Sequence, residues 1–218
     1  MHLVERDLLS GRFYLSTQMI RHDVINYLKK AETELDAGNI IIMGNELRLS
    51  SAFEVDENYK ITLKGFVDRL QYQKDALVIL DYKTGNVKDD GLKIARDSLD
   101  TLRTDPNYKQ FVQLIVYAIL IKNDNSIQYV DKPIRCGIVG IQDVNKNSDS
   151  YIHYAKVGDT ENRSLVNVTD TFDNVQLENF KQVLKDLFSE ILNPEEPIKQ
   201  VTDKKRCSYC DFKHICQR

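Results

Sequence analysis

GFVDR (residues 65–69) and LDYKTG (residues 80–85) each place an aspartate beside an apolar run, and the second segment also carries a lysine. In a β-strand the side chains at positions i and i+2 point to the same face, so Asp81 and Lys83 are expected to project together. Sequential strands commonly pair, which would bring Asp68 beside them. Two carboxylates and one ammonium group can hold a hard divalent cation and activate water beside a phosphodiester. The pattern therefore predicts a metal-dependent nuclease.

A later segment adds polar side chains to an otherwise apolar helix. Asp105 followed by Pro106 is typical of a helix start, with an N-cap and then proline at the first helical position. Residues 108–121 are apolar on nearly every side, which predicts a buried helix. Gln113 and Tyr117 are polar exceptions that lie four residues apart, and this spacing stacks them on one face. We expect this face to be directed at something polar.

In their order and spacing these segments resemble the core motifs of the PD-(D/E)XK nucleases of the RecB/AddB type, which are related to the CRISPR-associated iron–sulfur exonucleases. The resemblance runs from about Glu46 to Tyr117 and resumes at the C-terminus. It implies an α/β, restriction-endonuclease-like fold, with a mixed sheet flanked by helices. It also implies a Mg²⁺- or Mn²⁺-dependent deoxyribonuclease, an exonuclease in a recombination or repair helicase–nuclease. The implied partners are DNA, as single strands or duplex ends, and a helicase domain or subunit.

The resemblance also implies a role for each residue of the motifs. Asp68 and Asp81 would be metal ligands, together with the backbone carbonyl of Tyr82. Lys83 would orient the attacking water and stabilise charge that develops on phosphorus. The Gln113 and Tyr117 pair would contact DNA or brace the metal site.

Three further residues are expected near this site. Lys109 is predicted to contact DNA, and Arg69 to pair either with a phosphate or with a site carboxylate. Glu46 is expected at the edge of the active site, and a solvent-exposed glutamate is the alternative. Alternation along its segment places Leu47 and Leu49 on the opposite face from Glu46.

Two other interpretations of the motif residues stay open. Asp81 and Lys83 could form an ordinary ion pair on an edge strand, but residues 76–80 are so apolar that this strand should be central and covered on both faces. A non-catalytic DNA-binding or scaffold domain of the same fold is the second alternative. The intact set of Asp68, Asp81 and Lys83 favours catalysis.

The relatives carry a histidine metal ligand upstream of the first aspartate. His22 lies on a helical segment, but its neighbours do not match the pattern of the relatives. Our interpretation is that the chain is a C-terminal fragment of a longer protein and that the histidine helix lies outside it. His22 as a ligand is the alternative.

The cysteines near the C-terminus resemble ligands of a 4Fe–4S cluster. Cys207, Cys210 and Cys216 match three C-terminal ligands of the cluster-bearing relatives, and such clusters usually take four thiolates. Cys136 lies on an apolar segment and is predicted to be a buried core residue. A zinc site that includes His214 and a set of metal-free cysteines are the alternatives.

Composition sets broader limits. The chain has 218 residues, is 42% hydrophobic and 29% charged, and carries a net charge of −3, which does not favour nucleic-acid binding by itself. It has no apolar run near the ~20 residues that a membrane helix needs. The N-terminus lacks a signal-peptide pattern, and the few, clustered cysteines indicate a reducing compartment, so a cytoplasmic location is expected.

The chain is predicted to form a single nuclease domain over residues 1–218. It divides into a leading helical segment (1–38), a nuclease core (39–192) and a cysteine-containing tail (193–218). Residues 86–104 are charged and are expected to form a mobile or partly helical loop. Other helices are predicted over 12–36 and 173–192, and strands over 39–49, 60–72, 76–84, 134–144 and 151–157, the last two forming a hairpin across 145–150.

Overall fold

A computed structural model describes the greater part of the chain. The residues that it describes are 11–85, 87, 91–142, 150–151, 153–157, 165–197, 207–208 and 210–217.

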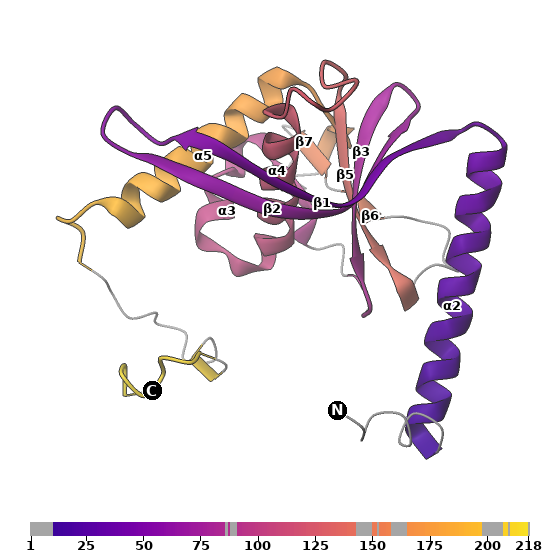
Figure 1. Ribbon diagram of the computed structural model, residues 1–218. Coiled ribbons are helices and arrows are strands. Elements are labelled where there is room, and N and C mark those ends of the chain that lie inside the picture. Colours follow the sequence, from indigo (N-terminus) through magenta and orange to yellow (C-terminus); the bar gives the residue numbers. More distant parts are fainter. Residues whose placement is uncertain are drawn as a thin grey trace.

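A mixed sheet forms the centre of the molecule (Figure 1). Its strand order is β1-β2-β3-β5-β6, and β9 also pairs with β5. The β3–β5 pair is parallel and the other pairs are antiparallel. The strands are β1 (Ile40–Glu54), β2 (Lys60–Gln73), β3 (Ala76–Lys83), β5 (Ile134–Gly140), β6 (Ser150–Tyr151) and β9 (Thr171–Phe172). This architecture confirms the predicted α/β, restriction-endonuclease-like class.

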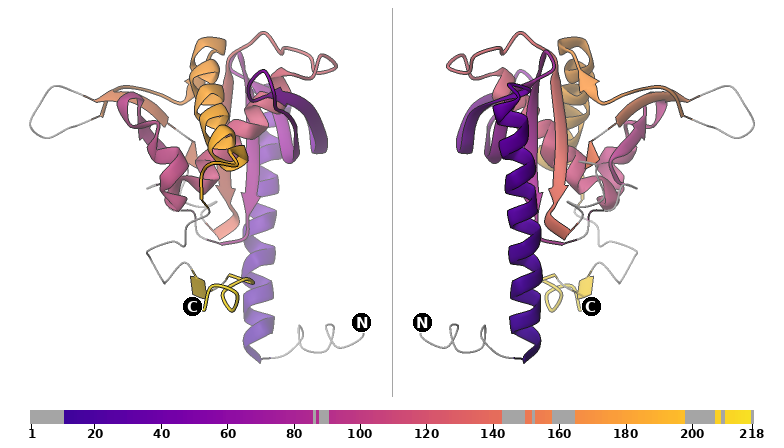
Figure 2. Two further views of the ribbon diagram at one scale, coloured as in Figure 1. Left: turned by 90° about the vertical axis from the view of Figure 1, so that its left-hand side faces the viewer. Right: turned by 90° about the vertical axis from the view of Figure 1, so that its right-hand side faces the viewer.

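Helices cover both faces of the sheet. α4 (Lys109–Lys122) and α5 (Asn174–Leu192) pack on one face, and their apolar side chains share a core with Leu77 and Ile79 of β3. α2 (Gly11–Asp36) lies on the other face, where its Tyr27 packs against a separate cluster that includes Leu80. Figure 2 shows the two groups of helices on opposite sides of the strands. Alternation along β3 thus divides its side chains between the two faces.

Local sequence signals explain where the helices begin. Asp173 accepts the backbone N–H of Gln176, whose side chain bonds the N–H of Asp173 in return, and this capping box starts α5. Asp105 caps a short 3₁₀ turn, Pro106–Tyr108, that leads directly into α4. The helices predicted over 12–36, 108–121 and 173–192 are therefore confirmed.

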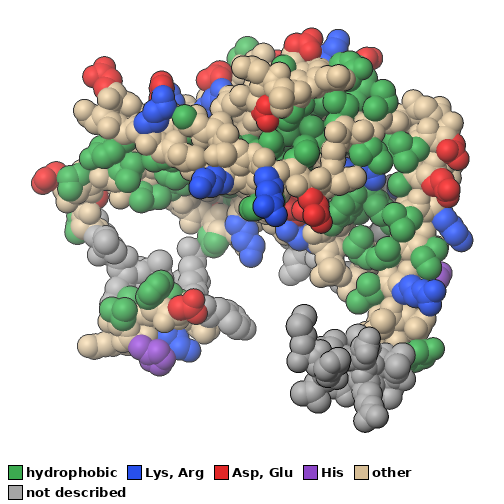
Figure 3. Space-filling view, viewed as in Figure 1, with side chains coloured by type: hydrophobic (Ala, Val, Ile, Leu, Met, Phe, Trp, Pro, Cys, Tyr) green, Lys and Arg blue, Asp and Glu red, His purple; other side chains and the backbone are tan. Residues whose placement is uncertain are grey.

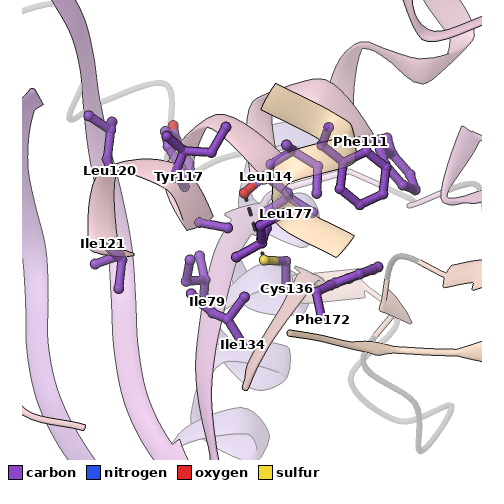
Figure 4. Close-up of a cluster of buried hydrophobic side chains, with 14 of the residues drawn as sticks. Ile79, Phe111, Leu114, Tyr117, Leu120, Ile121, Ile134, Cys136, Phe172 and Leu177 are labelled. Carbon is purple, nitrogen blue, oxygen red and sulfur yellow. Dashed lines mark hydrogen bonds between the residues drawn. The ribbon is translucent and has the colours of Figure 1, made fainter. Parts of the chain in front are cut away.

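The core beneath α4 is well packed, and β3 is buried from Ala76 through Asp81, as its composition predicted. Figure 4 shows Ile79, Ile134 and Phe172 of the sheet close to α4 side chains. Cys136 lies among them, with its Sγ 3.7 Å from the carbonyl oxygen of Leu114. Complete burial raises the pKa of its thiol, because the thiolate would lose hydration. The prediction of a buried core cysteine is confirmed.

α2 keeps much of its apolar side in solvent. Phe13, Leu15, Met19 and Leu28 are all exposed, and Figure 3 shows hydrophobic side chains at the surface along this helix. Only part of the apolar face of α2 therefore packs against other described residues. No helix among those residues is long and apolar enough to cross a membrane.

The prediction of a hairpin over residues 134–157 is only partly correct. β6 pairs antiparallel with β5, as expected, but β7 (His153–Val157) joins a separate sheet with β4 (Lys93–Ala95) and β8 (Leu165–Thr169). A period of two predicts a strand but does not select its partner, and for this reason the pattern could not assign residues 153–157 to the right sheet. Most of the predicted turn, 145–149, lies outside the described residues.

The charged stretch after β3 is partly helical, as expected. Besides β4 it contains a 3₁₀ turn, Arg96–Ser98, and the short helix α3 (Thr101–Thr104). Gly91 in this stretch is buried against the turn that precedes α4. A β-carbon added there would lie 2.1 Å from the backbone oxygen of Asn107.

Replacing Gly91 with alanine should therefore destabilise the protein by about 1–3 kcal/mol, because a backbone atom must move to make room. Urea unfolding followed by circular dichroism measures the difference. Gly85→Ala is the matched control, since an added β-carbon there meets no atom within 4 Å. Equal midpoints for the two variants would contradict the expected close approach.

Candidate active site

The two aspartates lie where β2 and β3 stop pairing. The last pair in register is Arg69 with Leu80, so Asp68 and Asp81 occupy the next position on each strand. Beyond this pair a side chain, instead of a backbone carbonyl, accepts the backbone N–H: Oδ2 of Asp68 accepts the N–H of Tyr82 at 2.7 Å. The side chain of Asp68 is thus tied to the backbone of the strand that carries Asp81.

Alternation along β2 is interrupted at this place. Gly65, Val67 and Leu70 all face the α4 side of the sheet, although regular alternation would place Leu70 on the face opposite the other two. Asp68 and Arg69 lie within the interruption. Local irregularities of this kind re-aim side chains near functional sites, although ordinary alternation already places the consecutive residues Asp68 and Arg69 on opposite faces.

Asp81 is a buried carboxylate, with only 4% of its surface exposed. The ammonium group of Lys83 lies 2.7 Å from its Oδ2, so these two side chains project together from β3. Burial raises the pKa of Asp81, the charge of Asp68 raises it further, and the contact with Lys83 opposes both effects. The site therefore holds negative charge that the protein itself only partly compensates.

The polar stripe of α4 is directed at this carboxylate. Nε2 of Gln113 donates to Oδ1 of Asp81 at 3.3 Å and to the hydroxyl oxygen of Tyr117 at 2.7 Å. Gly65 lets the Tyr117 ring approach β2, because an added β-carbon would lie 2.8 Å from that ring. The first residue of the GFVDR segment thus allows α4 to approach closely enough for Gln113 to reach Asp81.

Lys109 is the first residue of α4 and is exposed to solvent. Spacings of four residues place Lys109, Gln113 and Tyr117 along one face of the helix. Lys109 therefore lies at one end of the polar stripe whose Gln113 reaches Asp81.

Glu46 lies on β1 at the level of Asp68, between positions that pair with Arg69 and Val67. Its backbone has a φ of 50°, the left-handed region that non-glycine residues seldom adopt, and its side chain is exposed. Among the described residues no group of three His, Cys, Asp or Glu side chains is arranged to hold a metal ion. Glu46 is therefore near the aspartates in register but does not complete a three-carboxylate cluster with them.

Arg69 lies on the other face of the sheet from Gln113. It is buried, and its Nη1 donates to the hydroxyl oxygen of Tyr27 on α2 at 3.2 Å. The hydroxyl of Tyr27 is also hydrogen-bonded to that of Tyr82, at 2.9 Å. The structure thus does not bring Arg69 to the carboxylates, whereas it does bring Tyr27 to the strand end that carries them. Sequence reasoning missed Tyr27 because no local pattern joins positions this far apart.

The other predicted metal ligands lie apart from this site. His22 is exposed on α2, where its ring contacts Asn26 and Asp23. Cys207, Cys210 and Cys216 lie in the tail outside any disulfide of the described residues, and among those residues no three His, Cys, Asp or Glu side chains converge on a metal position. The iron–sulfur and zinc interpretations of the tail stay predictions.

The residues at the end of β2 and β3 suit a hard cation. Asp68 and Asp81 supply carboxylate oxygens from adjacent strands, which are the donors that Mg²⁺ and Mn²⁺ prefer. The partly compensated charge of Asp81 would be offset by a bound cation. Since the described residues gather two carboxylates here, the remaining ligands would be a backbone carbonyl, water and substrate oxygens.

Asp81→Asn is expected to raise the melting temperature in metal-free buffer at neutral pH, because it removes a buried charge whose pKa is raised by folding. A raised pKa means that the folded chain binds more protons than the unfolded chain, so the charge costs stability as pH rises above the ordinary aspartate value of about 3.9. The gain should vanish below that pH. The same variant should lose the stabilisation that Mg²⁺ or Mn²⁺ gives the native chain.

Thermal unfolding measured from below the ordinary aspartate pKa up to neutral pH, with and without the cation, reports both effects. Glu57→Gln serves as the control, because it removes one charge from an exposed position. An Asp81→Asn protein that melts below the native chain at neutral pH without metal would contradict the expected cost of burial.

Comparison with known protein families identifies the family of this chain. A family model described as "PD-(D/E)XK nuclease superfamily" matches residues 8–217. No curated protein matches the sequence. The solved structure titled "Crystal structure of SSO0001" is similar at a TM-score of 0.39 and 13% identity, over 89% of this chain and 67% of that chain. Because the family model covers nearly the whole sequence, the chain belongs to the PD-(D/E)XK nuclease superfamily.

Proposed function

We propose that this nuclease is a Mg²⁺- or Mn²⁺-dependent deoxyribonuclease of the RecB/AddB type. Its substrate would be DNA, as single strands or duplex ends, which it would degrade as an exonuclease beside a helicase domain or subunit. The observation that carries the proposal is the convergence of Asp68, Asp81, Lys83 and Gln113 at one place, where two strands separate beneath α4.

Each side chain has a distinct part in this proposal. A bound divalent cation would supply a Lewis acid that activates water and neutralises charge on the phosphate. Asp68 and Asp81 would hold it, with the carbonyl of Tyr82. Lys83, one-third exposed, would direct its ammonium group at the attacking water and at charge that develops on phosphorus.

The helix would act by orientation. Gln113 donates to Asp81 and so restricts the rotation of that carboxylate, and Tyr117 accepts from the same amide and restricts Gln113 in turn. Preorganised groups of this kind need no rearrangement as the reaction proceeds. Lys109 would bind a phosphate of the strand that enters the site.

A non-catalytic DNA-binding or scaffold domain is the second candidate. The absence of a third acidic or histidine ligand beside Asp68 and Asp81, among the described residues, favours it. The close contact of Lys83 with Asp81 favours catalysis, since DNA binding alone has no need of a buried carboxylate.

The remaining parts of the proposal concern the whole protein. We assign residues 1–38 to a leading helical segment, 39–192 to the nuclease core and 193–218 to a tail. Cys207, Cys210 and Cys216 would contribute to a 4Fe–4S cluster if a fourth thiolate is supplied; a zinc site with His214 and metal-free cysteines are the alternatives. Iron and zinc analysis of anaerobically purified protein distinguishes the three.

Cleavage of linear single-stranded DNA in the presence of Mn²⁺ tests the proposed activity. Asp81→Ala should abolish cleavage, because it removes a ligand, and Lys83→Ala should lower the rate by about 10²–10³-fold, as expected for the loss of one donor to developing charge. Lys83→Arg should not restore the rate, since a planar guanidinium cannot replace a movable point donor. Product formation on end-labelled substrate gives the rates.

Lys60→Ala is the control for folding and for loss of one surface charge, because Lys60 is exposed and pairs with the exposed Glu54. If the folded native chain binds DNA but never cuts it with either cation, the scaffold candidate replaces the catalytic one. If cleavage survives Asp81→Ala, the activity does not come from this site.

Lys109→Ala is expected to weaken DNA binding to a similar degree for all sequences, because a phosphate contact carries no sequence information. The slope of log K against log salt should fall by about 1, the effect of losing one phosphate contact. Fluorescence anisotropy at several salt concentrations measures it. An unchanged slope, equal to that of Lys60→Ala, would remove Lys109 from the DNA path.

A further inference from the structure

A cavity lies on the α2 side of the sheet. Its volume is about 220 Å³. Tyr27, Lys30 and Glu34 of α2 line it from one side, and Arg69, Gln71 and Lys74 from the other. Since Gln113 and α4 approach the strands from the opposite face, this cavity is separate from the carboxylate site.

Arg69 is a buried cation with no anionic partner among the described residues. It is 5% exposed, it donates to the neutral hydroxyl of Tyr27, and within the described part of the chain its Nε has no hydrogen-bond partner. No ion pair joins it to a carboxylate of the described residues. The carboxylate among the lining residues, Glu34, instead accepts from the side chain of Asn39 at 3.0 Å. A buried guanidinium left in this state is costly, which indicates that an anion belongs beside it.

Gln71 adds a second unpaired group. It is also 5% exposed, and its amide nitrogen donates to Gln73 at 3.0 Å, whereas its Oε1 has no partner in the part of the chain that the structure describes. The cavity thus presents an unused N–H donor and an unused oxygen acceptor from neighbouring positions of one strand. Lys30 and Lys74 at the edge make the lining more positive.

We propose that this cavity binds a small phosphate-class oxyanion. The charge of such an anion would pair with Arg69 and the two lysines, and its remaining O–H would donate to Oε1 of Gln71. Inorganic phosphate retains that O–H at neutral pH, whereas sulfate does not. The volume corresponds to roughly seven waters at ~30 Å³ each. It is below the ~300 Å³ at which pockets for larger organic ligands begin.

Two sources could supply this chemistry: free phosphate, or the terminal phosphate of a nucleic acid strand. Both present phosphate oxygens to Arg69, but at pH 7 inorganic phosphate keeps an O–H for Gln71, whereas a terminal phosphate monoester, with a second pKa of about 6, has largely lost it. The inference does not rest on the proposed deoxyribonuclease activity, because binding here requires neither a metal ion nor cleavage.

Thermal unfolding of the full chain in metal-free buffer at pH 7 tests the proposal, with phosphate, sulfate and chloride compared at equal ionic strength. Phosphate should raise the melting temperature with saturation, by about 5–10 °C at a hundredfold excess over Kd. Sulfate matters as a control because both oxyanions stabilise proteins through exclusion from the surface. An equal effect of phosphate and sulfate would overturn the proposal.

Variants locate the effect. Lys30→Gln, Gln71→Leu and Arg69→Met should each reduce or remove the phosphate-specific shift, whereas Lys29→Gln should keep it, because Lys29 is exposed and does not line the cavity. If Arg69→Met fails to fold, the other two lining variants decide the outcome. A shift that is unchanged in both of them would also overturn the proposal.

Oligonucleotides distinguish the sources. A 5′-phosphorylated oligonucleotide that stabilises at lower concentration than inorganic phosphate, and more than its 5′-hydroxyl counterpart, would assign the cavity to a strand end. Similar midpoints for the two phosphates would assign it to the free anion. Identical behaviour of both oligonucleotides, together with no effect of inorganic phosphate, would reject both sources while leaving the nuclease proposal intact.

Discussion

The buried carboxylate of Asp81 is the constraint on which the site depends. An ionised group at 4% exposure loses hydration, and the protein returns only part of that loss through Lys83 and Gln113. The charge is kept where an apolar residue would stabilise the fold better. Such an arrangement is typical of functional sites, where local stability is given up for chemistry.

The surrounding elements serve to keep this carboxylate in place. β3 is buried through Asp81, so its backbone is held from both sides. α4 approaches closely because Gly65 leaves room for the ring of Tyr117, and that contact sets the position of Gln113. Asp68 then fastens the end of β2 to β3 by accepting the Tyr82 N–H. The packing of α4 on one face of the sheet thereby fixes the orientation of the polar groups at the ends of β2 and β3.

The two faces of the sheet do different things with neighbouring residues. Asp68 is bound to the backbone of β3, whereas the next residue, Arg69, is buried against Tyr27 on the α2 side. Leu80 and Asp81 likewise face opposite helices. A short stretch of two strands therefore supplies both a carboxylate site and, behind it, a cationic cavity. An anion bound in that cavity would lie beside Arg69 and Leu80, which directly neighbour Asp68 and Asp81 in the sequence.

Local pattern alone determined much of this molecule: the helices over 12–36, 108–121 and 173–192, the central apolar strand, and the projection of Asp81 and Lys83 to one side. These features follow from periodicities of 3.6 and 2 and from capping residues, which act over a few positions. Partner choice does not follow from these signals, and the predicted hairpin places residues 153–157 in the wrong sheet. Tertiary structure also decided that Arg69 turns toward Tyr27 and that Glu46 stands exposed beside the aspartates. Both involve pairing or contacts between residues distant in the chain, for which no local pattern carries information.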